Sequence, residues 1–120
     1  AFLSLRVGGE LAGVLGWQVE NLVSRTVDID LRPDVAPADV LPALIEEMER
    51  SSRNLQCEAA LVFVSPNIAE APFWAKLGYE ARVPQSLGVS AWQEAALESK
   101  PPGSMLLFKQ LRVDRVLRPI

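Results

Sequence analysis

One amphipathic helical segment lies between two strand-like segments, and this order limits the folds that the chain can adopt. The residues before it, 22–31, alternate in polarity, and the residues after it, 59–64, are continuously apolar, as in a strand buried on both faces. A strand, a helix and a strand in succession predict two parallel neighbouring strands with the helix packed on their sheet. The apolar face of the helix comprises Val40, Leu41, Leu44, Ile45 and Met48.

Proline and aspartate indicate where this helix begins. The segment 32–38 contains Pro33 and Pro37, which cannot donate to a sheet ladder, so it is predicted to be a loop. Asp39 is a suitable N-cap residue, and Pro42 then falls in the first turn, where a missing N–H costs little. The sequence therefore predicts a helix over residues 39–53.

The first 31 residues have the pattern of a three-stranded meander. Residues 2–7 alternate in polarity, Gly8 and Gly9 supply a turn with positive φ, and residues 11–19 return as the second strand. The third strand, 22–31, follows a short break and carries Asp28 and Asp30 on the face opposite Ile29. Strict alternation assigns one face of this strand to Val23, Arg25, Val27, Ile29 and Leu31.

The second half of the chain adds shorter elements. A helix is predicted to end at Leu77, with Gly78 as its C-cap, followed by a strand over residues 79–83. Ser90 and Gln93 resemble a capping box for a helix that continues to Leu97, and a last strand covers residues 105–111. The predicted fold class is α/β, or α+β: a mixed sheet with an antiparallel meander, then a parallel β-α-β crossover, and helices packed on it.

Composition excludes several classes of function. The chain has no histidine, which removes Ser-His-acid and Cys-His nucleophile pairs and most catalytic zinc sites, so no metal site is expected. The formal net charge of −3 argues against nucleic acid as a partner. The one basic cluster, Arg112, Arg115 and Arg118, reads as a solvated terminal segment.

The single cysteine and the lack of a long apolar run bear on location. Cys57 alone permits no internal disulfide, which favours a reducing compartment and predicts a cytoplasmic protein. No apolar run approaches the roughly 20 residues that a membrane span requires, so no membrane association is expected. A chain of 120 residues is long enough for one domain with one core.

The stretch NIAEAPFWAKLGYE, residues 67–80, resembles the end of the GNAT (Gcn5-related N-acetyltransferase) fold. The phrase FWAKLGYE is the specific part, and the preceding strand, corner, helix and strand fall at that family's spacing. The resemblance covers roughly residues 11–111 and implies a mixed GNAT-like sheet. It also implies acetyl-CoA or another acyl-CoA as cofactor. Fold and activity are separable, so the function rests on the site residues.

The loop that would hold the pyrophosphate of coenzyme A departs from the family pattern. The family has Arg or Gln and then Gly-x-Gly-x-Gly/Ala where this chain has Ala36, Pro37, Ala38, Asp39, Val40 and Leu41. Pro37 removes an N–H donor, and Asp39 adds a negative charge at the start of the helix. Two functions stay open: an acyl-CoA-dependent N-acetyltransferase, or a non-catalytic dimerisation or regulatory module that binds no cofactor.

The resemblance also implies positions for site residues. Asn67 would approach the pantetheine arm, or act as a turn or N-cap residue with Glu70 completing a capping box. Trp74 falls where the family often has a tyrosine acid; an indole is no useful acid, and core packing is its structural role. The residues expected near the cofactor are Ile29, Leu31, Val35, Asp39, Val40, Asn67 and Trp74.

The catalytic residues are not fixed by the sequence. A carboxylate near the acceptor amine could take its proton, which makes Glu20, Asp28 and Asp30 candidate bases, and Tyr79 lies close enough in sequence to be a candidate acid. Asp28 and Asp30 are also typical of a solvated strand face.

Family members usually carry a strand and two helices before the hairpin with which this sequence starts. We therefore expect residues 1–120 to form a single GNAT-like domain without those elements. The sheet face that they would cover is then apolar and open. Either the sequence is a fragment of a larger protein, or a partner covers this face, which predicts a homodimer or a close association with another chain.

Overall fold

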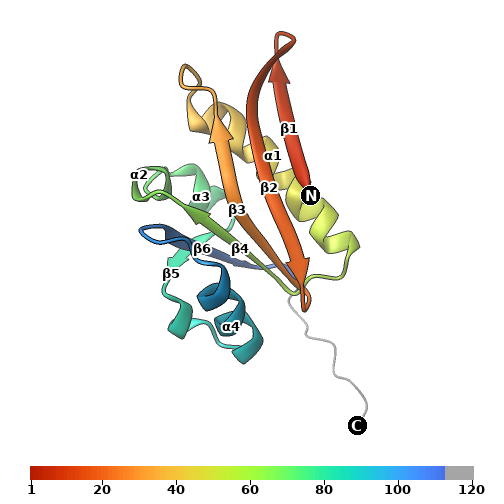
Figure 1. Cartoon of the computed structure of the whole chain (residues 1–120), viewed down its shortest axis with the longest axis vertical. Coiled ribbons are helices and arrows are strands. Elements are labelled where there is room, and N and C mark those ends of the chain that lie inside the picture. Colours follow the sequence, from red (N-terminus) through yellow and green to blue (C-terminus); the bar gives the residue numbers. More distant parts are fainter. Residues whose placement is uncertain (113–120) are drawn as a thin grey trace.

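The computed structural model describes residues 1–112 and contains one six-stranded sheet in the order β1-β2-β3-β4-β6-β5 (Figure 1). The strands are β1 Phe2–Val7, β2 Glu10–Glu20, β3 Val23–Leu31, β4 Ala59–Val64, β5 Glu80–Arg82 and β6 Met105–Gln110. The helices are α1 Pro37–Asn54, α2 Pro66–Ala69, α3 Phe73–Lys76 and α4 Ser90–Ser99, with a short 3-10 turn at Pro84–Ser86. None of the helices within residues 1–112 has the length and apolar character needed to cross a membrane.

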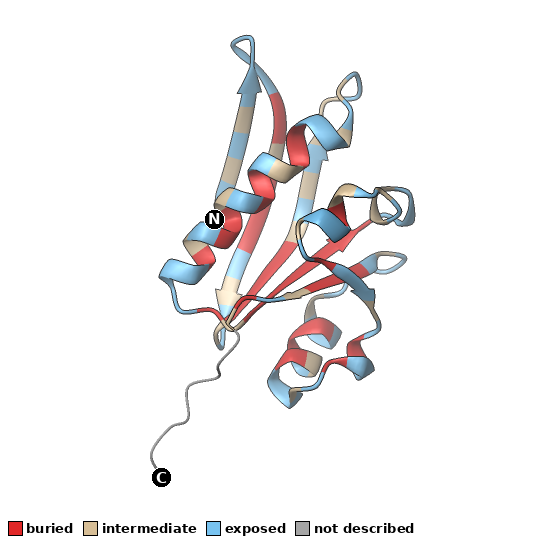
Figure 2. Ribbon diagram, turned by 180° about the vertical axis from the view of Figure 1, so that it is seen from behind, coloured by how far each residue is buried: buried red, intermediate tan, exposed pale blue. Residues whose placement is uncertain are grey.

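Helices cover both faces of this sheet. The larger core lies between one face and α1, α2 and α3, and its buried residues include Leu15, Leu44, Ile45 and Trp74. The smaller core packs α4 against the opposite face of β3, β4 and β6. Figure 2 shows the buried side of α1 turned toward the sheet and a buried stripe along β4. The expected mixed α+β sheet is confirmed.

The crossover that the sequence predicts is present. β3 and β4 are parallel neighbours, paired from Val23↔Ala59 to Thr26↔Val62, and α1 connects them. β1, β2 and β3 form the expected antiparallel meander, with Gly8 and Gly9 at positive φ in its first turn. Every residue of β4 is buried, as expected for a strand covered on both faces.

The start of α1 differs from the prediction. The N-cap residue is Ala36, which makes no side-chain cap, and Pro37 occupies the first helical turn instead of the loop. The prediction of Asp39 as N-cap was therefore wrong. Proline is favoured at this position because its φ is already helical and its missing N–H would be unpaired anyway. Asp39 lies in the first turn, and Pro42 follows inside the helix.

A β-bulge in β3 overturns the prediction that five alternate residues share one face. The register with β2 passes from Gly16↔Asp28 to Trp17↔Thr26, which leaves Val27 as an extra residue. Val23 and Val27 pack in the core beside α4, whereas Ile29 and Leu31 pack in the core beside α1. A bulge shifts the alternation by one residue, so the two ends of the strand present odd-numbered side chains to opposite faces.

The second predicted helix is two separate turns. Pro72 cannot donate a backbone hydrogen bond, and the chain breaks between α2 and α3 at Ala71 and Pro72. The N-cap of α2 is Ser65, without a side-chain hydrogen bond, so the capping box of Asn67 and Glu70 does not form. Gly78 has φ +90° and ends α3 as predicted.

The last elements deviate from the predicted boundaries. β5 covers three residues, Glu80–Arg82, because Pro84 starts a 3-10 turn soon after it. α4 has no side-chain cap, so the capping box of Ser90 and Gln93 was wrong: the Gln93 amide donates to the carbonyl of Leu87. Of the basic cluster, Arg115 and Arg118 lie outside the described residues.

Candidate functional site

The sheet opens between its two parallel strands. The described ladder between β3 and β4 stops at Thr26↔Val62, although both strands continue, and Figure 1 shows them diverging from that point. The backbone groups of β3 that face β4 beyond Thr26 therefore have no ladder partner on that strand. An extended ligand can form hydrogen bonds with such groups in the way that an added strand would.

A cavity of about 350 Å³ occupies this opening, which we call the cleft. Its walls come from both strands, from α2 with its N-cap Ser65, and from one loop. Val27 is the bulged residue, so the bulge and the cleft coincide. The residues that line the cleft are Val27, Ile29, Phe63, Val64, Ser65, Ile68 and the loop 101–104.

A second cavity, of about 430 Å³, adjoins the cleft at Ile68, which lines both. It lies between the start of α1 and the α2–α3 segment, and we call it the outer cavity. Its lining is largely apolar. The two polar side chains that line it are Asn67 and Lys76, and the others are Ala36, Pro37, Ala38, Ile68, Ala71, Pro72 and Phe73.

The start of α1 offers little to an anion. Pro37 has no N–H, the N–H of Asp39 is bonded to the Ala36 carbonyl at 2.9 Å, and the exposed Asp39 carboxylate lies in the same turn. Arg32 lies in the preceding segment, but its guanidinium is held by Glu10 at 3.0 Å and Asp34 at 2.5 Å. A helix start binds anions through free N–H groups and the positive end of the dipole, and here these features are reduced or opposed.

A third cavity, of about 380 Å³, adjoins the cleft on the side of α4 and shares Val27 and Pro101 with it. We call it the α4 cavity. The exposed Asp28 lines it directly after the bulge. The buried Arg25 also lines it; its Nη1 donates to Ser99 Oγ at 2.9 Å and to Glu98 Oε2 at 3.2 Å. The α4 cavity thus presents a carboxylate beside the point where it meets the cleft.

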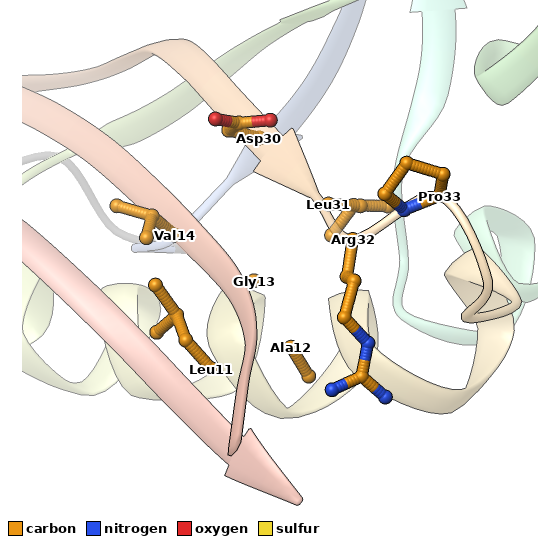
Figure 3. Close-up of a pocket in the computed structure, with 8 residues that line it drawn as sticks. All are labelled: Leu11, Ala12, Gly13, Val14, Asp30, Leu31, Arg32 and Pro33. Atoms are coloured by element: carbon orange, nitrogen blue, oxygen red, sulfur yellow. The ribbon is translucent and has the colours of Figure 1, made fainter.

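A further cavity, of about 270 Å³, lies where β2 begins and β3 ends (Figure 3). It is lined by the segments 11–14 and 30–33, which share no residue with the cleft. Figure 3 shows the Asp30 carboxylate and the Arg32 guanidinium pointing in different directions. Asp28 and Asp30 therefore lie at different cavities although they are two residues apart.

The expected cofactor residues occupy different environments. Ile29 lines the cleft and Asn67 lines the outer cavity. Asp39 is exposed in the first turn of α1. Trp74 is 2% exposed, and its indole N–H donates to the Ile68 carbonyl at 2.9 Å, so this group is used inside the fold. The others that pack in the core beside α1 are Leu31, Val35 and Val40.

The candidate catalytic residues are also separated. Glu20 is 3.8 Å from the Arg25 guanidinium, whereas Tyr79 lines yet another cavity, with Lys109 and Gly78. The Tyr79 hydroxyl donates to Glu49 Oε2 at 3.3 Å. Burial, together with the negative charge of Glu49, raises the pKa of Tyr79 far above its ordinary value. A phenol held in this way does not release its proton near neutral pH.

Several residues of the cleft had no signal in the sequence. Phe63 and Val64 read as buried strand residues, and Ile68 as part of a helix. The loop 101–104 was predicted only as a break before the last strand, yet it forms one wall of the cleft. The bulge at Val27 had no signal in the sequence, because residues 27–31 alternate in polarity as in a regular strand.

Solved structures with the same architecture are found, although no family model and no curated protein matches the sequence. The acetyltransferase of the GNAT family from Staphylococcus aureus superposes with a TM-score of 0.68 at 12% identity, over 92% of this chain and 68% of the other. PaiA N-acetyltransferase from Thermoplasma acidophilum, in complex with coenzyme A, gives 0.64 at 13% identity, over 91% and 59%. N-acetylglutamate synthase from Neisseria gonorrhoeae, with coenzyme A and N-acetyl-glutamate, gives 0.57 at 13%, over 92% and 26%.

The fold defined by this sheet, its central parallel pair and its flanking helices is an α+β fold with a split mixed sheet. It is the GNAT fold, as the resemblance of residues 67–80 implied. The chain spans 59% of the length of the PaiA protein and 26% of the synthase.

Proposed function

We propose that the chain is an acyl-CoA-dependent N-acyltransferase domain whose donor lies in the cleft between β3 and β4. The observation that carries the proposal is the open cleft at the point where the two parallel strands separate. Its unpaired backbone edge suits the amide-containing pantetheine arm, and the GNAT-fold proteins from Thermoplasma acidophilum and Neisseria gonorrhoeae were solved with coenzyme A.

The acceptor amine enters through the α4 cavity in this proposal. That cavity meets the cleft at Val27, so an amine there faces a thioester in the cleft. The amine nitrogen attacks the thioester carbonyl, an amide C–N bond forms and the C–S bond breaks. Asp28 accepts the proton that the amine loses, directly or through water, and the departing thiolate takes a proton from water. Asp28 is the one candidate base that lines this cavity.

A titration with acetyl-CoA, followed by an acetyl-transfer assay on a panel of primary amines, tests the proposal. Ser65→Trp fills the cleft from an exposed position, and Ser4→Trp, exposed on β1, is the matched control. We expect saturable binding that Ser65→Trp abolishes and Ser4→Trp preserves. The proposal fails if acetyl-CoA does not bind, or if both variants bind it equally well.

A non-catalytic role is the second candidate, and the start of α1 favours it. With Pro37 and Asp39 in place of a glycine-rich phosphate loop, the chain would serve as a dimerisation or regulatory module. β1 is an edge strand of the sheet, and Phe2 is 73% exposed on it. We propose that two copies associate through the face of β1 and β2 that α1 does not cover, where Phe2 is exposed.

We also propose that residues 1–120 belong to a single GNAT-like domain. A cytoplasmic location is part of the same proposal. It is supported by Cys57, which is a buried free thiol, as proteins of reducing compartments commonly have.

A further inference from the structure

Ile68 lines both the cleft and the outer cavity, so the two cavities are neighbours. A long thioester donor placed with its acyl end at Val27 runs along the cleft, passes Ile68 and continues into the outer cavity. The neutral arm of the donor would lie in the cleft, beside the unpaired backbone edge of β3. The nucleotide and its phosphates would lie at the outer cavity, beside the start of α1.

Charge at the outer cavity opposes phosphates. Among the described residues that line it, Lys76 is the one cation. The Asp39 carboxylate lies in the first turn of α1, whose start forms one wall. Arg32 is held by its contacts with Glu10 and Asp34. A diphosphate with a further ribose phosphate would therefore meet one free positive charge and one negative charge of the protein.

Backbone donors do not make up for the missing charge. Of the first three residues of α1, Pro37 has no N–H and the N–H of Asp39 is taken by the Ala36 carbonyl, which leaves Ala38. Apart from Asn67 and Lys76, the residues that line the outer cavity are alanine, proline, Ile68 and Phe73, which have no side-chain donor. A phosphate buried against such a surface loses its hydration without equivalent hydrogen bonds.

We infer that the donor is recognised through its pantetheine arm alone, so that the chain takes acyl-pantetheine thioesters as a class and gains no affinity from the nucleotide of coenzyme A. This inference rests on the proposed function, because it assumes a thioester in the cleft. The inference adds the substrate class to the proposed function. The amide-containing pantetheine arm determines the affinity, and the group attached to the far end of the arm lies against a surface that does not bind that group.

The experiment compares acetyl-CoA with S-acetyl-pantetheine on the whole chain, by calorimetry and by acetyl transfer to the same amine. We expect the two dissociation constants to agree within about threefold. Two phosphate hydrogen bonds of ordinary charge-assisted strength would instead favour acetyl-CoA by about a hundredfold, and that result would overturn the inference. If neither thioester binds, the proposed function fails as well, so the two failures are distinguishable.

A charge-reversal pair gives an independent test. Asp39→Lys places a cation at the start of α1, and Glu46→Lys makes the same charge change on an exposed position about 10 Å further along the helix. We expect Asp39→Lys to tighten acetyl-CoA binding about tenfold or more and to leave S-acetyl-pantetheine unchanged. Glu46→Lys should change neither by more than about twofold, because solvent and salt screen it.

Either of two results in this pair contradicts the inference. Equal tightening by both lysine variants would contradict the placement of the nucleotide beside the start of α1, on which the inference depends. Loss of acetyl-CoA binding in Asp39→Lys, with S-acetyl-pantetheine retained, would show that the native loop contacts the nucleotide. Both positions are exposed, so both variants are expected to fold. Melting curves check this.

Discussion

Asp28 and Asp30 occupy the same strand and differ by which cavity they reach. Asp28 lines the α4 cavity beside Val27, and Asp30 lines the cavity where β2 begins and β3 ends. If Asp28 accepts the proton of the amine, Asp28→Asn should reduce acetyl transfer by about 10²-fold or more, and Asp30→Asn should leave it within about twofold. Steady-state rates report the acetyl-transfer step, and a parallel titration reports acetyl-CoA binding. Together the two measurements distinguish an effect on chemistry from an effect on binding. Equal losses in both variants would remove Asp28 as the base.

Tyr79 is expected to make the free energy of unfolding decrease with pH in the alkaline range. Its pKa in the folded chain lies far above the unfolded value near 10, because burial and Glu49 disfavour the phenolate. The unfolded state therefore loses its phenol proton above about pH 10 while the folded state keeps it. Stability is full below that pH and falls above it, by up to about 1.4 kcal/mol per pH unit.

The measurement is the free energy of unfolding from denaturant curves between neutral pH and the alkaline range. Tyr79→Phe is expected to reduce the slope above about pH 10, whatever it does to the absolute stability. Burial also raises the pKa of the Cys57 thiol, which adds a second slope from about pH 9, so both proteins are compared in a Cys57→Ala background. An unchanged slope would show that Tyr79 ionises while folded.

At the scale of the elements, α1 is fixed to the sheet by close apolar packing. Leu44 is 3% exposed on the buried face of the helix. Leu44→Ala removes three carbons from a filled site and is expected to cost about 2 to 4 kcal/mol. Leu55→Ala, just after the helix at 54% exposure, is the control and should cost well under about 1 kcal/mol. Denaturant melts compare the two, and similar midpoints would mean that the helix face is misassigned.

Gly13 lies on β2 close to side chains of α1 and β3. A Cβ there would lie 2.8 Å from Val40 Cγ1 and 2.9 Å from Leu31 Cδ2, so these side chains would have to shift to accommodate it. Gly13→Ala should destabilise the fold by about 1 to 3 kcal/mol. A Cβ at Gly88 meets nothing within 4 Å, so Gly88→Ala is the matched control and should be neutral or slightly stabilising. A loss at Gly88 that equals the loss at Gly13 would argue against packing as the cause.

At the scale of the whole molecule, the sheet is covered unevenly. α1 covers one face of β1 and β2, and Figure 1 shows the other face of these strands without a helix over it. Leu3 packs in the core beside α1, so the adjacent Phe2 points to this open face. If two copies associate here, light scattering should give twice the monomer mass, and Phe2→Ser should shift it toward the monomer. A monomer at high concentration would contradict the association.

The sequence alone determined the elements whose signal is local. These elements are the apolar face of α1, the continuous apolar run of β4 and the glycine turn of the first hairpin. Each depends on residues that are close in sequence, so its pattern can be recognised without the tertiary structure. From them followed the parallel pairing of β3 and β4 and the fold class. The resemblance placed Ile29 and Asn67 near a cofactor; Ile29 lines the cleft and Asn67 lines the outer cavity, and their binding role stays a prediction.

Tertiary structure alone decided where the sheet opens. The bulge at Val27 depends on the register between β2 and β3, and the last pair, Thr26↔Val62, depends on two strands far apart in sequence. The loop 101–104 reaches the cleft only because β6 pairs with β4. Local periodicity specifies which face of an element is buried, whereas the point at which two strands part is a balance between distant contacts, and no single segment of sequence contains it.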